Sequence, residues 1–179
     1  MLKRFSLLFC LAALLGVNSM TATPVRATAD GLFPPVVRDE ALAIVVNKTN
    51  PIESLSSNDL RNLLLAEQKT WSNGRRVTIV MREPGQPERI AVLKAVCRMT
   101  DSDYTKYFLQ AQFTGDLQAT PKVLATTTGM RKFVFNVPGA IGYVRASEVD
   151  ASVKTVRVDG LLPGDPGYKI RLVSLGSQG

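Results

Sequence analysis

The stretch SLSSNDLRNLLLAEQKTWSNGRRVTIV, residues 54–80, decides the fold class because it contains a helix, a turn and a strand in succession. Ser56 is placed to cap the helix, and Asp59 is placed to close a capping box with it. The Asn-Gly pair at 73–74 suits a turn with positive φ. Residues 77–81 are apolar enough for a strand that is buried on both faces. This order is typical of an α/β fold.

Apolar strands and amphipathic helices continue to alternate on either side of this stretch. Residues 41–46 form an unbroken apolar run, which is typical of a strand in a parallel sheet with both faces covered. Further helices are expected at about 87–98, 101–111 and 126–136, and further strands at 141–144, 153–158 and 170–175. The predicted fold class is therefore α/β: a three-layer sandwich around a mainly parallel sheet.

The N-terminal segment has the order of a secretory signal peptide. Lys3 and Arg4 precede an apolar stretch at 5–17, and a polar segment ends in Val-Arg-Ala at 25–27. The apolar stretch is shorter than the roughly 20 residues of a membrane span, although an uncleaved anchor is the alternative. We expect a signal peptide at 1–27, a flexible lead-in at 28–40 and one domain at 41–179, in the periplasm or secreted.

Composition excludes several classes of function. Removing residues 1–27 takes away three basic residues and no acidic one, so the formal charge falls from +7 to +4. No block of Lys and Arg stands out, which argues against nucleic acid as a partner. Contact with the membrane is expected only through the signal peptide. The 152 remaining residues suit one domain with its own core.

The chain contains no histidine, which excludes Ser-His and Cys-His catalysis and histidine metal sites. Cys97 has no partner once the signal peptide is removed. It is either a reactive thiol or, as is commoner for free cysteine, a buried apolar side chain. An enzyme using Glu83 and Glu88 as acid and base is the weakest hypothesis. We expect no catalytic residue, no metal and no cofactor.

The stretch MREPGQPER, residues 81–89, follows a predicted strand and precedes a predicted helix, the usual layout of an anion cradle. Pro84 and Pro87 have no N–H to offer an anion. Glu88 adds a negative charge to the first helical turn, where it favours the helix dipole. The loop therefore either binds an anion or is an ordinary helix start with solvated arginines. Its candidate ligand residues are Arg82, Gly85, Gln86 and Arg89.

Threonines supply four further candidate contacts. Thr114 and Gly115 form a predicted turn, and Thr127 and Thr128 lie at a predicted helix start. Their hydroxyl and amide groups can bind an anion, or they can simply cap helices, which is the commoner role. Tyr143 is expected in the core or in the wall of a cleft.

Taken together, several stretches resemble the phosphate-binding type of periplasmic solute-binding protein, the extracytoplasmic receptor of an ABC transporter. They are residues 54–80, FTG at 113–115, VPGAIGYV at 137–144 and KTVRVDGLLPGDPGYKIRLVSL at 154–175. The resemblance covers about residues 41–175 and implies one lobe of a type II periplasmic binding protein. It implies phosphate or another small oxyanion as ligand and an ABC permease as partner.

The resemblance also marks two departures. Ordinary family members are considerably longer and close two lobes over the ligand. In the family's phosphate binders the equivalent strand is followed by Arg, an acidic residue and Gly-Ser-Gly-Thr. Here Arg82 and Gly85 match that pattern, whereas Pro84, Gln86 and Glu88 do not. The resemblance therefore implies weakened binding of phosphate.

Three hypotheses follow. The chain is a solute-binding domain, or a scaffold or protein-interaction domain that keeps the fold with a degraded anion loop, or an enzyme. If the N–H groups of the anion loop converge on a cleft, the solute-binding domain is favoured. If the polar groups of the loop make hydrogen bonds within the chain, the scaffold is favoured. A homodimer that rebuilds a cleft between two lobes stays open.

Overall fold

The computed structural model describes residues 40–115 and 120–172. The predicted signal peptide, the lead-in up to residue 39 and the end of the last predicted strand lie outside these residues. Those expectations remain predictions. Within the described residues, no helix is long and apolar enough to cross a membrane.

The centre of the domain is a five-stranded sheet in the order β4-β3-β5-β1-β6. Its strands are β1 (Leu42–Val46), β3 (Thr78–Arg82), β4 (Lys122–Leu124), β5 (Ala140–Arg145) and β6 (Lys154–Thr155). β3 is parallel to both neighbours, and β1 is antiparallel to both of its own. Four strands therefore share one direction while β1 opposes them, which confirms a mainly parallel sheet.

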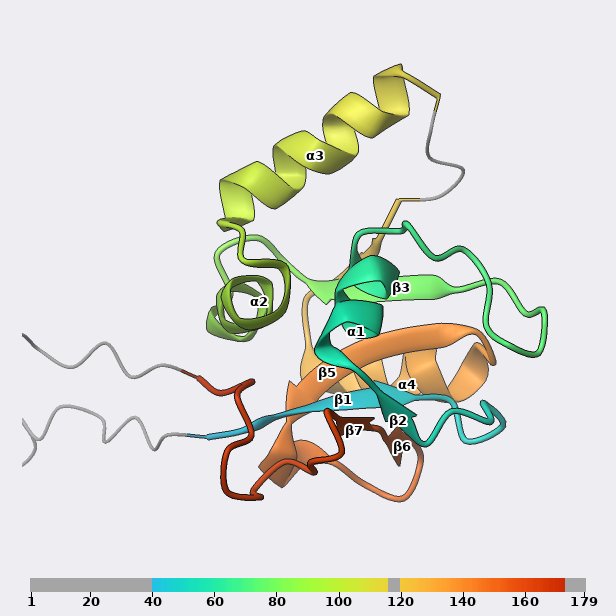
Figure 1. Ribbon diagram of the computed structural model, residues 1–179, viewed down its shortest axis with the longest axis vertical. Helices are drawn as coiled ribbons and strands as arrows, with labels where there is room; N and C mark the ends of the chain where they lie inside the picture. The colour runs from blue at the N-terminus through green and yellow to red at the C-terminus, as the bar shows by residue number, and fades with distance from the viewer. Residues whose placement is uncertain (1–39, 116–119, 173–179) are drawn as a thin grey trace, which may run out of the picture. The chain divides into compact units, whose positions relative to one another are not determined.

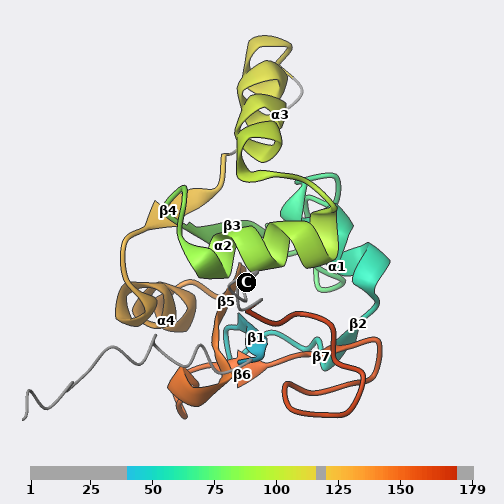
Figure 2. The same cartoon turned by 90° about the vertical axis from the view of Figure 1, so that its left-hand side faces the viewer.

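Helices cover the sheet in the predicted three-layer arrangement. They are α1 (Ser57–Leu64), α2 (Pro87–Val92), the π-helical turn η1 (Leu93–Cys97), α3 (Asp101–Phe113) and α4 (Thr127–Asn136). Figures 1 and 2 place α4 on one face of the sheet and α1 on the other. α2 lies across the end of the sheet at which β3 finishes, and α3 projects away from the sheet beyond it.

The local signals in the sequence correspond to the observed element starts. The capping box between Ser56 and Asp59 is present at α1. Thr100 and Thr126 cap α3 and α4 through their side chains. Gly74 has the positive φ of 78° that the Asn-Gly turn predicts. These predictions are therefore confirmed. They could be made from the sequence because each depends only on residues within one helical turn or one hairpin.

The C-terminal strands differ from the prediction. The predicted strand at 153–158 is two short strands, β6 in the large sheet and β7 (Arg157–Val158), which is parallel to β2 (Ser54–Leu55). The described part of the strand predicted at 170–175 makes one antiparallel bridge, between Ala41 and Arg171. The sequence analysis missed β4, which has only three residues, and the 3-10 turn η2 (Ala146–Glu148).

Candidate anion-binding site

The loop between β3 and α2 has the strand–turn–helix geometry that its sequence predicts. β3 ends at Arg82 and α2 begins at Pro87. Gly85 has φ 82°, in the left-handed region that side-chain-bearing residues avoid. Gln86 takes the N-cap position without a side-chain hydrogen bond, so no side chain caps this helix start. The Gln86 N–H donates to the Glu83 carbonyl at 3.2 Å.

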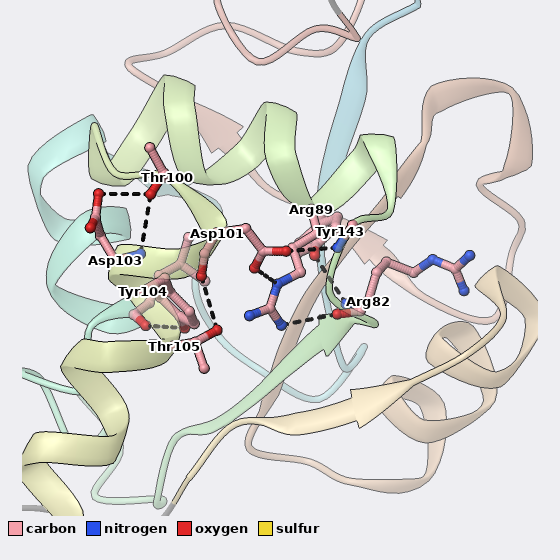
Figure 3. Close-up of polar contacts among 10 residues, drawn as sticks. Arg82, Arg89, Thr100, Asp101, Asp103, Tyr104, Thr105 and Tyr143 are labelled. Atoms are coloured by element: carbon pink, nitrogen blue, oxygen red, sulfur yellow. Dashed lines mark hydrogen bonds and ion pairs between the residues drawn. The ribbon is translucent and has the colours of Figure 1, made fainter.

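A carboxylate from the same chain occupies one side of this loop. Asp101, the first residue of α3, accepts from the Gly85 N–H at 2.7 Å and from Arg89 Nε at 2.5 Å (Figure 3). Arg89 Nη1 also donates to the Arg82 carbonyl at 3.1 Å. The Arg89 guanidinium lies 5.3 Å from the centre of the Tyr104 ring. Gly85 and Arg89 therefore already bind an anion, and Asp101 supplies it.

The Arg82 side chain points away from this cluster, as Figure 3 shows. Arg82 is only 9% exposed, yet within residues 40–115 and 120–172 its Nε and Nη1 have no hydrogen-bond partner. Its backbone N–H donates to Tyr143 Oη at 3.0 Å. A buried guanidinium with unpaired donors is costly, so this arrangement indicates either strain or a place for a ligand.

Sheet register shows which face Arg82 occupies. Thr78 pairs with Ala140 in the parallel β3–β5 ladder, so Arg82 and Gly142 share a face. A Cβ on Gly142 would lie 3.1 Å from the sulfur of Met130 in α4. The face of the sheet that Gly142 and Arg82 share is therefore the face covered by α4. Arg82 also pairs with Leu124, the last residue of β4, shortly before α4 begins. The guanidinium therefore lies on the side of the sheet from which α4 starts.

Three charged side chains around the loop are buried, which contradicts the reading of an ordinary helix start with solvated arginines. Glu88 is not solvated: it is 5% exposed, and its Oε1 accepts from Arg145 Nε at 2.8 Å and Nη2 at 2.7 Å. The hydrogen bond to Glu88 raises the pKa of Arg145 above its ordinary value. Arg82 and Arg89 are not solvated either, because both are buried. The turn itself at 83–85 is exposed, whereas the charged side chains that flank it are buried, which a local reading of the sequence does not reveal.

The predicted threonine contacts fall in two different places. Thr127 and Thr128 form the first turn of α4, whose cap is the Thr126 side chain accepting from the Gly129 N–H at 3.0 Å. Thr114 and Gly115 follow the C-terminus of α3, whose 13 residues span about 20 Å from Asp101. The structure therefore places Thr127 and Thr128 on the side of Arg82, and it does not bring Thr114 and Gly115 to the loop.

The sequence analysis missed Asp101 as a partner of the loop. Its position after Thr100 marked it as an ordinary helix-start residue, and Gly85 lies 16 positions earlier, with no signal of contact in the sequence between them. Tyr143 is in the core, as expected, and burial raises the pKa of its hydroxyl. Across the described residues, no group of three or more Cys, Asp or Glu side chains is arranged to hold a metal ion.

Cys97 is buried, and burial raises the pKa of its thiol to about 12. Because the thiolate is the reacting form, we expect no labelling of Cys97 by iodoacetamide at pH 8 in the native protein and complete labelling in guanidinium. Peptide mass spectrometry measures both. Labelling of native Cys97 as fast as a free thiol in solution would instead indicate a reactive site.

Several solved structures with a similar fold are receptors or substrate-binding proteins of phosphate transporters. An ABC-type phosphate transport receptor from Vibrio cholerae is 22% identical, with a TM-score of 0.57 over 69% of this chain and 48% of that one. A putative phosphate ABC transporter substrate-binding protein with bound phosphate, from Clostridium perfringens, is 22% identical, with a TM-score of 0.57 over 68% and 46%. PstS from Borrelia burgdorferi is 12% identical, with a TM-score of 0.59 over 74% and 55%.

The sequence itself gives no comparable match. No protein-family model matches the chain, and no curated protein matches it. The chain spans about half the length of each of the three receptors. At these identities the likeness concerns the fold, and it agrees with the resemblance found in the motifs. The described chain thus has the fold of part of a phosphate-type substrate-binding protein of an ABC transporter.

Proposed function

We propose that the protein is an exported, non-enzymatic solute-binding domain that holds phosphate or another small oxyanion weakly, with Arg82 as the anchor. The observation that carries this proposal is the buried Arg82 guanidinium with two unpaired donors. It lies at the carboxyl end of β3, and ligands of open α/β sheets bind at this end of the strands. Phosphate is the first candidate because two of the solved structures with a similar fold are a phosphate transport receptor and a substrate-binding protein with bound phosphate.

The start of α4 supplies the second part of the proposed site. The first amides of a helix have no partner within the helix, and they favour an anion. Thr127 and Thr128 carry two of these amides, on the same side of the sheet as Arg82. An oxyanion between Arg82 and this helix start would use charge and main-chain donors together. Thr114 and Gly115 have no part in this site.

Weak binding follows from two features of the chain. Gly85 and Arg89 are already engaged by Asp101, so the loop cannot offer them to an anion on the Arg82 side. The chain also spans about half of the receptors with this fold, and a single lobe leaves the ligand open to water. An ABC permease, or a second copy of this chain facing the site, would be the partner that completes it.

The alternative is a scaffold or protein-interaction domain. One observation favours it: the polar groups of the loop at Gly85 and Arg89 are satisfied by the chain itself. Under this alternative Arg82 is a buried charge retained without a ligand.

Calorimetric titration with phosphate at low ionic strength tests the proposal, with Arg82→Met as the variant. We expect saturable binding between micromolar and millimolar concentrations, weakened about 10- to 100-fold in Arg82→Met, since a charge-assisted hydrogen bond contributes about 1.5–3 kcal/mol. Lys106→Ala is the matched control, because it removes one positive charge from an exposed position of α3. Its binding should be unchanged.

Stability separates the two candidate functions further. Arg82→Met replaces an unpaired buried charge with an apolar side chain, so the free energy of unfolding should stay the same or rise. Absence of heat up to millimolar phosphate would support the scaffold. So would equal phosphate binding by Arg82→Met and the unaltered protein, because it would remove Arg82 as the anchor.

A further inference from the structure

The Asp101 carboxylate is held in the way that a protein loop holds a separate anion. Its two oxygens accept from different donors, Oδ2 from the Gly85 N–H at 2.7 Å and Oδ1 from Arg89 Nε at 2.5 Å. One donor is a main-chain amide at a turn before a helix, and the other is a buried guanidinium. This pairing of amide and arginine is the chemistry expected of a site for carboxylate or phosphate.

Space and charge both point to a site that an external anion can enter. Gly85 is exposed and the Asp101 side chain is 20% exposed, so the position of the carboxylate is open to solvent. Arg89 is 4% exposed, and its other contacts, the Arg82 carbonyl and the Tyr104 ring, carry no formal charge. Among the residues that the structure describes, Asp101 is the carboxylate paired with Arg89. A buried charge left without its partner is strongly unfavourable.

We propose that Asp101 is a tethered anion, and that Gly85 and Arg89 form a latent site for a small carboxylate or phosphate that opens when the Asp101 carboxylate is removed. This site differs from the proposed Arg82 site. Arg82 lies on the α4 face and points away from Asp101 (Figure 3). The loop has therefore kept its capacity to bind anions, and α3 supplies the occupant.

α3 stays docked without the Asp101 contact, which makes the proposal testable. Tyr104 is 2% exposed, and its Oη donates to the Leu64 carbonyl at 2.7 Å. Phe108, one turn further along, is also buried. Thr100 caps α3 through the Asp103 N–H, independently of Asp101. We therefore expect Asp101→Ala and Asp101→Asn to fold.

Acetate is the probe, followed through the Gly85 amide in ¹⁵N–¹H correlation spectra. In Asp101→Ala we expect a saturable shift of this resonance, with acetate bound at least about tenfold more tightly than by the unaltered protein, because a charged hydrogen-bond partner becomes available. Asp103→Asn is the matched control. It removes the same charge two residues away, at an exposed position, and should leave the Gly85 resonance insensitive to acetate.

A second variant, Asp101→Asn, and a second readout, the melting temperature, distinguish failure of this proposal from failure of the proposed Arg82 site. Asp101→Asn retains an oxygen for the Gly85 N–H but leaves Arg89 without a charged partner, so acetate should raise its melting temperature above that in chloride at equal ionic strength. Adding Arg82→Met to Asp101→Ala should leave the acetate effect intact, even if phosphate binding at Arg82 fails. Folded Asp101 variants that take up no acetate would overturn the proposal. So would an unaltered protein whose Gly85 resonance responds to acetate as strongly as that of Asp101→Ala.

Discussion

Gly139→Ala is expected to destabilise the fold by roughly 3 kcal/mol or more, at the upper end of the usual effect of overpacking. A Cβ at this position would lie 2.0 Å from the carbonyl oxygen of Arg76, which is main chain and cannot rotate away. The Gly139 carbonyl also accepts from the Thr78 N–H and from Trp71 Nε1, both at 2.9 Å. The added methyl group would therefore push apart the start of β5 and the start of β3.

Gly142→Ala is the matched comparison, because it adds the same methyl group three residues later in the same motif. Its Cβ would meet the Met130 sulfur at 3.1 Å, and this flexible side chain can move. We expect a loss of about 1 kcal/mol or less there. Urea unfolding followed by circular dichroism measures both variants. Equal losses at the two positions would show that the close approach at Gly139 can relax.

The motif at 137–144 was recognised from its residue types, and the structure supplies a physical reason for its two glycines. Gly139 does not have a positive φ, so its backbone conformation does not demand glycine. Glycine is needed there because a side chain would have no space. Gly142 leaves room for Met130 of α4 on the opposite face from Tyr143. Each glycine is thus favoured by a contact with another segment of the chain, strictly at Gly139 and less so at Gly142, which the motif alone does not reveal.

Elements that depend on neighbouring residues were predictable, whereas those that depend on distant ones were not. The capping box at Ser56 and the buried strand β1 follow from local chemistry and apolar runs. β4 is three residues long, and its central residue Val123 is half exposed, so it carries no strand signal. The break between β6 and β7 arises because β7 pairs with β2, about 100 residues earlier.

The candidate site shows the same division. The sequence predicted that Arg82 ends a strand and that Gly85 lies in the turn before a helix, and the structure has this layout because it depends on neighbouring residues. It could not show that Asp101 fills one side of the loop, or that Glu88 pairs with Arg145 across 57 residues. Whether Arg82 binds an oxyanion remains the prediction that titration decides.

Arg89→Met is expected to lower the free energy of unfolding by about 3 kcal/mol, the lower end of the cost of breaking a buried ion pair, because Asp101 is partly exposed. The variant removes the bond to Asp101, the bond to the Arg82 carbonyl and the contact with the Tyr104 ring. Methionine fills much of the same volume, so a cavity adds little. Urea unfolding gives the value.

A double-mutant cycle with Asp101→Asn shows whether this loss comes from the ion pair. Asp101→Asn should cost about as much as Arg89→Met: it leaves the more buried charge, Arg89, without an ionic partner, although the asparagine oxygen can still accept from the Gly85 N–H. If the two side chains act as a pair, the combined loss should fall short of the sum by about 1 kcal/mol or more. Additive losses would mean that Arg89 stabilises the loop chiefly through the Arg82 carbonyl and Tyr104. Acetate should restore stability to Asp101→Asn but not to Arg89→Met, because only the first keeps the guanidinium that an anion can bind.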